Sequence, residues 1–242
     1  MRPFKAPAAF PALQAAALAP AMAMLLALAT VPALAPTAAA QESWPVFESS
    51  EALPPSSDIR FSFRYPPSFA KTADLPGPDT VPEADATAAD AGEAAHGRPP
   101  APLRYFTGDV PGSARHVTMF AVLGRLMPDD KELMEYFGPE EWWEAMGQEM
   151  GRDLGTFAGA VPVEYRGLPA ADLSYSWEKG EGPGKLAFLT VRRSVVSEEI
   201  LLSLVCILRV PASEAGTNGL EPGRGDDFER YCRPFLDSLE LR

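Results

Sequence analysis

The sequence is poor in the residue types that carry most enzyme chemistry. Its 242 residues include two cysteines and only two histidines, His96 and His116. A hydrolase triad needs a histidine within hydrogen-bond reach of its nucleophile, and no G-x-S-x-G motif accompanies either histidine. Two cysteines are also too few for a zinc site built on cysteine alone. We therefore expect no catalytic residue, no cofactor and no metal ligand, and an envelope hydrolase is the least favoured function.

Positive charge is scarce as well. Lys and Arg number 21 against 33 Asp and Glu, which gives a formal net charge of −12. An acidic chain repels phosphate backbones and anionic lipid. We therefore expect no nucleic-acid partner and no binding to a membrane surface. The acidity alone does not indicate a cationic partner, because it serves solubility equally well.

The apolar run near the N-terminus is too short and too rich in proline for a membrane span, which needs about 20 apolar residues. It follows the charged residues Arg2 and Lys5, continues through AMAMLLALATV and ends in PTAAAQESW. A basic start, an apolar centre and small residues at Ala38 and Ala40 are typical of a secretory signal peptide cleaved before Gln41. We predict a signal peptide over residues 1–40, a periplasmic or secreted protein, and no membrane span after cleavage.

Two tracts of the remaining chain have a composition that argues against regular structure. Residues 41–57 are predicted to form an exposed lead-in. Residues 74–102 hold six acidic residues, one arginine and almost no large apolar side chain. Such a composition cannot bury enough surface to offset the entropy of ordering. We expect a single domain over residues 58–242 with a disordered acidic insertion at about 74–102.

Alternation of apolar and polar residues predicts a set of strands. The stretch DIRFSFRYPPSFA places Phe61, Phe63 and Tyr65 on one face and is stopped by two prolines. HVTMFAVL at 116–123 is apolar on both faces, which is typical of a central strand. Later alternating runs, which begin at Val161 and are separated by turns, predict an antiparallel meander.

The stretch PEEWWEAMGQEMGRDL predicts a helix over residues 139–154. Residues placed 100° apart around its axis bring Trp143, Met146 and Met150 into one arc and leave Trp142 at the rim. We predict that Trp143 lies in the core and that Trp142 is the more exposed aromatic. Trp142 is then either a partner contact or a half-buried packing residue.

The C-terminal stretch DDFERYCRPFLDSLEL predicts a second helix, with Asp226 and Glu229 in a capping-box pattern. Cys232 points from this helix toward a sheet, and Cys206 points from an apolar strand face toward a helix. If the helix packs on that strand, a disulfide closes a loop of about 26 residues and contributes ~3 kcal/mol. Two buried reduced thiols are the alternative. An exported compartment is one in which a disulfide persists.

The order of these elements and three short motifs resemble the PsbP-like superfamily, which includes PsbP, Mog-type and DcrB-type proteins. The motifs are Y-P-P-x-F after the first strand, G-x-P-A at Gly167 to Ala170, and F-L-D-S-L near the C-terminus. The resemblance covers about residues 58–242. It implies an exported bacterial member with an α+β fold, an α/β/α sandwich with a central antiparallel sheet. It also implies a domain that usually lacks enzymatic activity and often acts by binding other proteins.

We therefore expect an exported, non-enzymatic domain that works through contacts with an unidentified protein partner in the cell envelope. The alternative is a periplasmic module that binds a small ligand or a metal ion in a pocket between sheet and helix. Some photosynthetic relatives bind metal ions, but no residue here matches one of their ligands.

Overall fold

The computed structural model describes residues 43–54, 57, 59–72, 102–126, 128–216 and 221–242. All of them lie in one compact unit that spans Ala35–Arg242. The predicted signal peptide and nearly all of the predicted acidic insertion lie outside the described residues.

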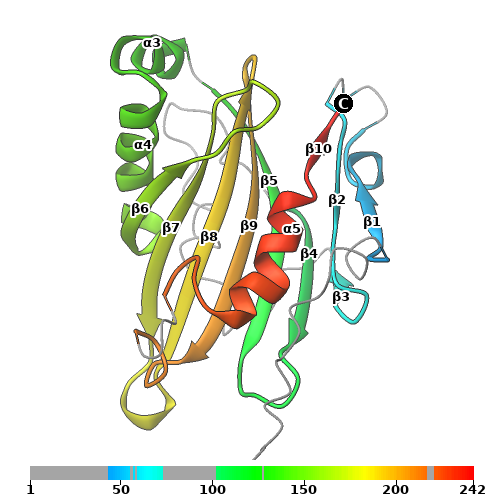
Figure 1. Ribbon diagram of the computed structural model, residues 1–242, viewed down its shortest axis with the longest axis vertical. Coiled ribbons are helices and arrows are strands. Elements are labelled where there is room, and N and C mark those ends of the chain that lie inside the picture. The colour runs from blue at the N-terminus through cyan, green and yellow to red at the C-terminus, as the bar shows by residue number, and fades with distance from the viewer. Residues whose placement is uncertain (1–42, 55–56, 58, 73–101, 127, 217–220) are drawn as a thin grey trace, which may run out of the picture. The chain divides into compact units, whose positions relative to one another are not determined.

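An antiparallel sheet of seven strands forms the centre of the fold (Figure 1). The strand order is β3-β4-β5-β9-β8-β7-β6, and every neighbouring pair is antiparallel. The strands are β3 (Ala70–Thr72), β4 (Pro102–Asp109), β5 (His116–Arg125), β6 (Thr156–Pro162), β7 (Ala170–Lys179), β8 (Leu186–Ser197) and β9 (Ile200–Pro211). The predicted meander is confirmed as β6 to β9, with β6 at one edge of the sheet.

A second sheet of three strands has the order β1-β2-β10. Its strands are β1 (Val46–Glu48), β2 (Phe61–Arg64) and β10 (Glu240–Leu241). The stretch DIRFSFRY therefore supplies the middle strand of a small separate sheet, whereas a single central sheet was expected. Alternation identifies β2 as a strand, but its partners come from the two ends of the described chain, which no local pattern reveals.

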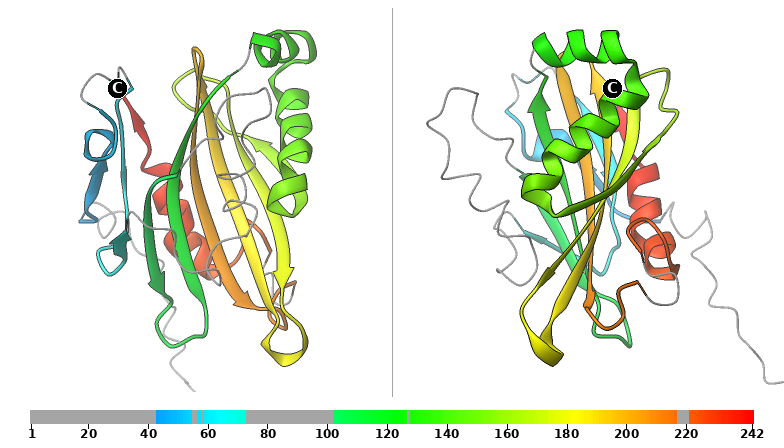
Figure 2. Two further views of the ribbon diagram at one scale, coloured as in Figure 1. Left: turned by 180° about the vertical axis from the view of Figure 1, so that it is seen from behind. Right: turned by 90° about the vertical axis from the view of Figure 1, so that its left-hand side faces the viewer.

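Helices cover both faces of the main sheet, as Figure 2 shows in its right-hand view. The helices α3 (Pro128–Phe137) and α4 (Pro139–Leu154) lie on one side, where α4 packs on β6 and β7. A π-helical turn, η3 (Phe228–Cys232), and the helix α5 (Arg233–Asp237) lie on the other side and contact β9. Two short 3-10 turns, η1 (Ser49–Glu51) and η2 (Gly182–Gly184), complete the described elements. The predicted α+β sandwich around an antiparallel sheet is confirmed.

The largest core lies between the main sheet, the small sheet and α5. Phe63 of β2 is at its centre, with ring centroids 5.5 Å from Phe106 of β4 and 5.2 Å from Phe235 of α5. A separate core lies under α4, where Trp143 packs with Leu173 and Tyr175 of β7. The predicted inward face of β2 is thus confirmed.

One predicted strand boundary and one predicted helix cap are wrong. The first strand of the meander begins at Thr156, not at Val161, because the chain turns directly from α4 into β6 at Gly155, where φ is 109°. The C-terminal helix has no capping box, since no side chain caps η3. The carboxylate of Asp227, the residue before η3, lies 2.5 Å from Nη1 of Arg115.

A search of the described helices finds none that is both long and apolar enough to cross a membrane.

Candidate protein-contact site

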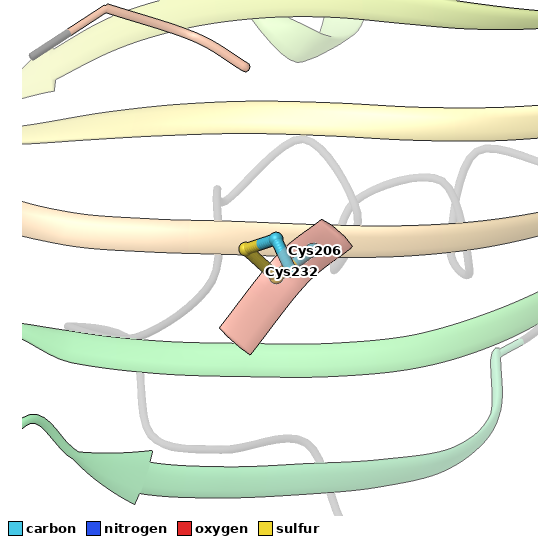
Figure 3. The surroundings of a disulfide bond; sticks show 2 residues. All are labelled: Cys206 and Cys232. Atoms are coloured by element: carbon cyan, nitrogen blue, oxygen red, sulfur yellow. A yellow bond between two sulfur atoms is a disulfide. The ribbon is translucent and has the colours of Figure 1, made fainter. Parts of the chain in front are cut away.

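Cys206 and Cys232 are joined by a disulfide between β9 and η3 (Figure 3). The Cα atoms are 5.6 Å apart and both side chains are fully buried. The bond ties the C-terminal segment to the middle of the sheet, and the pair is therefore a structural element of the core, remote from any exposed surface.

His116 forms a pair with a carboxylate but lacks the third member of a catalytic triad. Its Nδ1 lies 2.8 Å from Oδ1 of Asp109, its direct neighbour across β4 and β5. The hydrogen bond from His116 lowers the pKa of Asp109. Nε2 of His116 is buried and contacts no hydroxyl, thiol or other hydrogen-bonding group among the described residues. A triad requires a nucleophile at that nitrogen.

Metal ligands do not gather in the described part of the chain, where no group of three His, Cys, Asp or Glu side chains could hold an ion.

Trp142 is buried, with 4% of its surface exposed, so its predicted exposure at the rim of α4 is wrong. Its ring lies 4.6 Å from that of Trp143, and both belong to a cluster with Leu126 and Met134. Met134 comes from α3, which packs against α4. A rim position on an isolated helix becomes a core position once a second helix lies beside it, and Trp142 therefore has no surface for a partner.

The exposed aromatic side chains are on α3. Tyr136 is 82% exposed, Phe137 is 50% exposed and Leu133 is 46% exposed. Their spacing of three and four residues places them on one side of the helix, and the rings of Tyr136 and Phe137 meet edge to face at 4.9 Å. We call these three residues the α3 patch. Exposed apolar groups of this kind mark surfaces that contact other molecules.

Acidic residues surround the α3 patch. Asp129 and Asp130 lie in the first turn of α3, where the helix dipole favours negative charge. Asp129 is seven residues before Tyr136 and Asp130 is seven before Phe137, so each carboxylate lies on the same side of the helix as the aromatic rings. Carboxylates on the same side of a helix as its apolar residues are the sequence signal that could have identified the patch, because a helix side that packs in the core carries no charged residue.

A groove of about 440 Å³ runs between α4 and the edge strand β6. Glu144, Gln148 and Gly151 line it on the helix, and Phe157, Ala158 and Gly159 line it on the strand. The helix approaches the strand closely, because a Cβ atom added to Gly147 would lie 2.4 Å from the ring of Phe157. The groove and the α3 patch together are the candidate contact site.

Comparison with known proteins assigns no family to this chain. No family model matches the sequence, and no curated protein matches it either. Solved structures with weak similarity to it include the following two. LpqN of Mycobacterium tuberculosis, a protein involved in cell envelope biogenesis, is 11% identical with a TM-score of 0.39, over 82% of this chain and 91% of LpqN. A protein of Bacteroides thetaiotaomicron is 11% identical with a TM-score of 0.34, over 75% of this chain and 45% of that protein. Likenesses this weak assign neither family nor function, and the PsbP-like resemblance stays a prediction.

Proposed function

We propose that this protein is an exported, non-enzymatic domain that acts by binding another protein through the α3 patch. The observation that carries the proposal is that α3 has no buried residue and nevertheless exposes Leu133, Tyr136 and Phe137. Most helices in proteins are held by packing an apolar face on the rest of the fold. In α3 only Met134 packs partly against the core, and its other large apolar side chains are left for a partner.

The chemistry of the patch favours a protein over a lipid surface. Apolar side chains at positions i, i+3 and i+4 of a helix fit a groove on a partner protein, and tyrosine is enriched among the residues that dominate binding energy. Asp129 and Asp130 on the same side of α3 would be repelled by anionic headgroups. A partner surface with an apolar groove and a basic rim matches both properties.

The disulfide and the predicted signal peptide both support an extracytoplasmic location. Cys206 and Cys232 are bonded, and such bonds persist in oxidising compartments and are rare in the cytosol. The predicted signal peptide over residues 1–40 agrees with that compartment. The envelope or the medium is therefore where a partner is to be sought.

The proposal is tested by comparing the proteins that co-purify with three tagged versions of the chain from the envelope fraction of its own organism. The versions are the unaltered chain, the double variant Tyr136→Ser with Phe137→Ser, and Val46→Ser. Val46 is an exposed valine on β1, outside the patch, and serves as the matched control. We expect the double variant to lose a partner that the control retains. If both variants retain the same proteins at unchanged thermal stability, the patch is not the binding surface.

A second function is favoured by two buried polar atoms under α4. The hydroxyl of Tyr175 and Nε1 of Trp143 are buried without a hydrogen-bond partner, and both side chains belong to the core between α4 and the sheet. A small polar ligand between helix and sheet would satisfy these groups, since buried polar groups are almost always hydrogen-bonded. A thermal-shift screen with divalent cations and polar metabolites tests this function, because a ligand of the folded chain raises the melting temperature by an amount that grows with the logarithm of its concentration above Kd.

A further inference from the structure

We propose that the groove between α4 and β6 binds an extended basic peptide, which adds as a further strand to the edge of the main sheet. The inference rests on the proposed protein-binding function and adds that a segment of the partner binds as an extended strand. It is carried by three properties of the described residues: outward backbone groups on an edge strand, a groove with open space at Gly159, and a carboxylate on its helix wall.

The outer edge of β6 has backbone groups that face away from the sheet. Among the residues that the structure describes, β6 is the last strand of the main sheet and pairs only with β7. The N–H of Val163 donates to the carbonyl of Ala170 at 2.9 Å, so Val163 faces β7. Because backbone groups of successive residues in an antiparallel strand point to alternate sides, Ala160 directs its N–H and its carbonyl outward. An incoming strand would pair with these groups.

The two edges of the main sheet differ in how well they are protected. Natural edge strands avoid pairing with other chains by being short or charged. The opposite edge, β3, has three residues and includes Lys71. β6 has seven residues, TFAGAVP, without a charged side chain. A register shift at Ala158 and the proline at position 162 limit its regular edge to Gly159–Val161, where Val161 is 62% exposed. Strand addition uses an exposed edge of this kind.

The strand side of the groove leaves room for a peptide backbone at Gly159. Gly151 of α4 and Gly159 of β6 both line the groove. At Gly151 the helix already contacts β6, because an added Cβ atom would lie 3.2 Å from Cβ of Phe157. A Cβ atom added to Gly159 would meet no atom within 4 Å. The groove volume of about 440 Å³ also lies within the range of about 300–1,000 Å³ that is usual for binding clefts.

The charge of the helix wall selects the occupant. Glu144 and Gln148 line the groove, with Nε2 of Gln148 3.3 Å from Oε1 of Glu144. An exposed carboxylate at this position favours lysine or arginine on the peptide. A second copy of this chain is disfavoured, because pairing β6 with β6 would bring two acidic α4 helices together, and like charges across an interface oppose association.

The first test uses the purified, disulfide-bonded chain, labelled with ¹⁵N, and two short acetylated peptides. One peptide alternates threonine with lysine, and the other alternates threonine with glutamate. We expect the lysine peptide at millimolar concentration to shift the amide signal of Ala160, and the glutamate peptide to leave it unchanged. Absence of any shift on β6 with the lysine peptide overturns the proposal.

Two variants separate strand pairing from general attraction of charge. Ala160→Pro removes the outward N–H and leaves the bonds to β7 in place, since proline is tolerated at outward-facing positions of an edge strand. We expect this variant to weaken binding of the lysine peptide about tenfold. Glu144→Lys should reverse the preference, so that the glutamate peptide binds more tightly than the lysine peptide. This second variant tests the proposal even if Ala160→Pro does not fold. Glu149→Lys, with the same charge change on another side of α4, should keep the preference for lysine.

Three outcomes contradict the inference. Equal binding by the unaltered chain and a folded Ala160→Pro variant would exclude strand pairing, and equal effects of Glu144→Lys and Glu149→Lys would exclude the groove. A dimer of the unaltered chain that Ala160→Pro dissociates would assign the edge to a second copy. These experiments use a purified chain and synthetic peptides. A negative result would therefore contradict strand addition at β6 but not the proposal that the α3 patch binds a partner.

Discussion

Arg193 and Asp172 face each other across β8 and β7 and form an ion pair with two hydrogen bonds. Nε of Arg193 lies 2.7 Å from Oδ1 of Asp172, and Nη2 lies 2.9 Å from Oδ2. Two residues at the ends of α5 join the pair: Asp237 accepts from Nη1 of Arg193 at 2.5 Å, and Arg233 donates to Oδ2 of Asp172 at 3.2 Å. The pair thus fastens α5 to the sheet on the side opposite α4.

Asp172→Ala should lower the free energy of unfolding by about 3–5 kcal/mol, because it leaves a buried guanidinium with one exposed partner. The side chain of Arg193 is only 6% exposed. Glu178→Ala is the matched control, since it removes the exposed ion pair between β7 and Lys185, the residue before β8, and should cost about 0–1 kcal/mol. Urea unfolding measures both. Equal losses would mean that the buried pair has no special role.

Replacement of both Cys206 and Cys232 by alanine should lower the free energy of unfolding by about 3 kcal/mol, because the disulfide restricts a long loop in the unfolded chain. The two cysteines are 26 residues apart. Thiol titration of the denatured protein purified from the envelope should detect no free thiol. Two free thiols in such a sample would show that the bond does not form there.

Tyr175 should make stability depend on pH in the alkaline range. Burial raises the pKa of Tyr175 from 10.0 to about 12, against the opposing effect of the charge on Arg192. The folded chain therefore keeps this proton where the unfolded chain releases it, and stability falls as pH rises from about 10 to about 12. Below about pH 10, Tyr175 is protonated in both states and does not lower the stability of the folded chain.

Tyr175→Phe removes this titration. Between about pH 10 and about pH 12, the variant should lose less stability than the unaltered chain. At neutral pH its free energy of unfolding should change by less than about 1 kcal/mol, since the hydroxyl of Tyr175 has no hydrogen-bond partner. Urea unfolding as a function of pH measures both effects. Parallel pH profiles for the two proteins would show that Tyr175 does not titrate in this range.

Trp142→Ala should lower stability much more than Tyr136→Ala. Loss of the buried Trp142 side chain should cost about 3–5 kcal/mol, whereas loss of the exposed Tyr136 side chain should change stability by about 0.5 kcal/mol or less. Urea unfolding of the two variants measures the difference. A larger loss for Tyr136→Ala would contradict the burial that assigns Tyr136 to the surface.

Periodicity predicts those elements whose two sides differ in polarity. Leu173 and Tyr175 alternate with polar neighbours, and β7 is found with both of them buried. The Trp143 arc of α4 is predicted for the same reason. The pairing of β2 with β1, in which Phe63 lies opposite Phe47, could not be predicted, because short strands from distant parts of the chain have no local signature of their partners.

The candidate site was largely missed because exposure depends on how helices pack on one another. Trp142 lies at the rim of α4 when that helix is taken alone, and only α3 turns the rim into core. The exposed aromatics are then Tyr136 and Phe137, on the shorter and more acidic helix. The open edge of β6 was likewise hidden, since its strand was expected to begin at Val161 rather than at Thr156.

The most direct test of the central claim is photo-crosslinking in the cell envelope. A benzophenone-bearing phenylalanine analogue is placed at position 136, and at position 46 as the control, in the otherwise unaltered chain. The account predicts a discrete adduct with one protein from position 136 and no such adduct from position 46. Identical adduct patterns from the two positions, or none from position 136, would contradict a partner-binding role for the α3 patch.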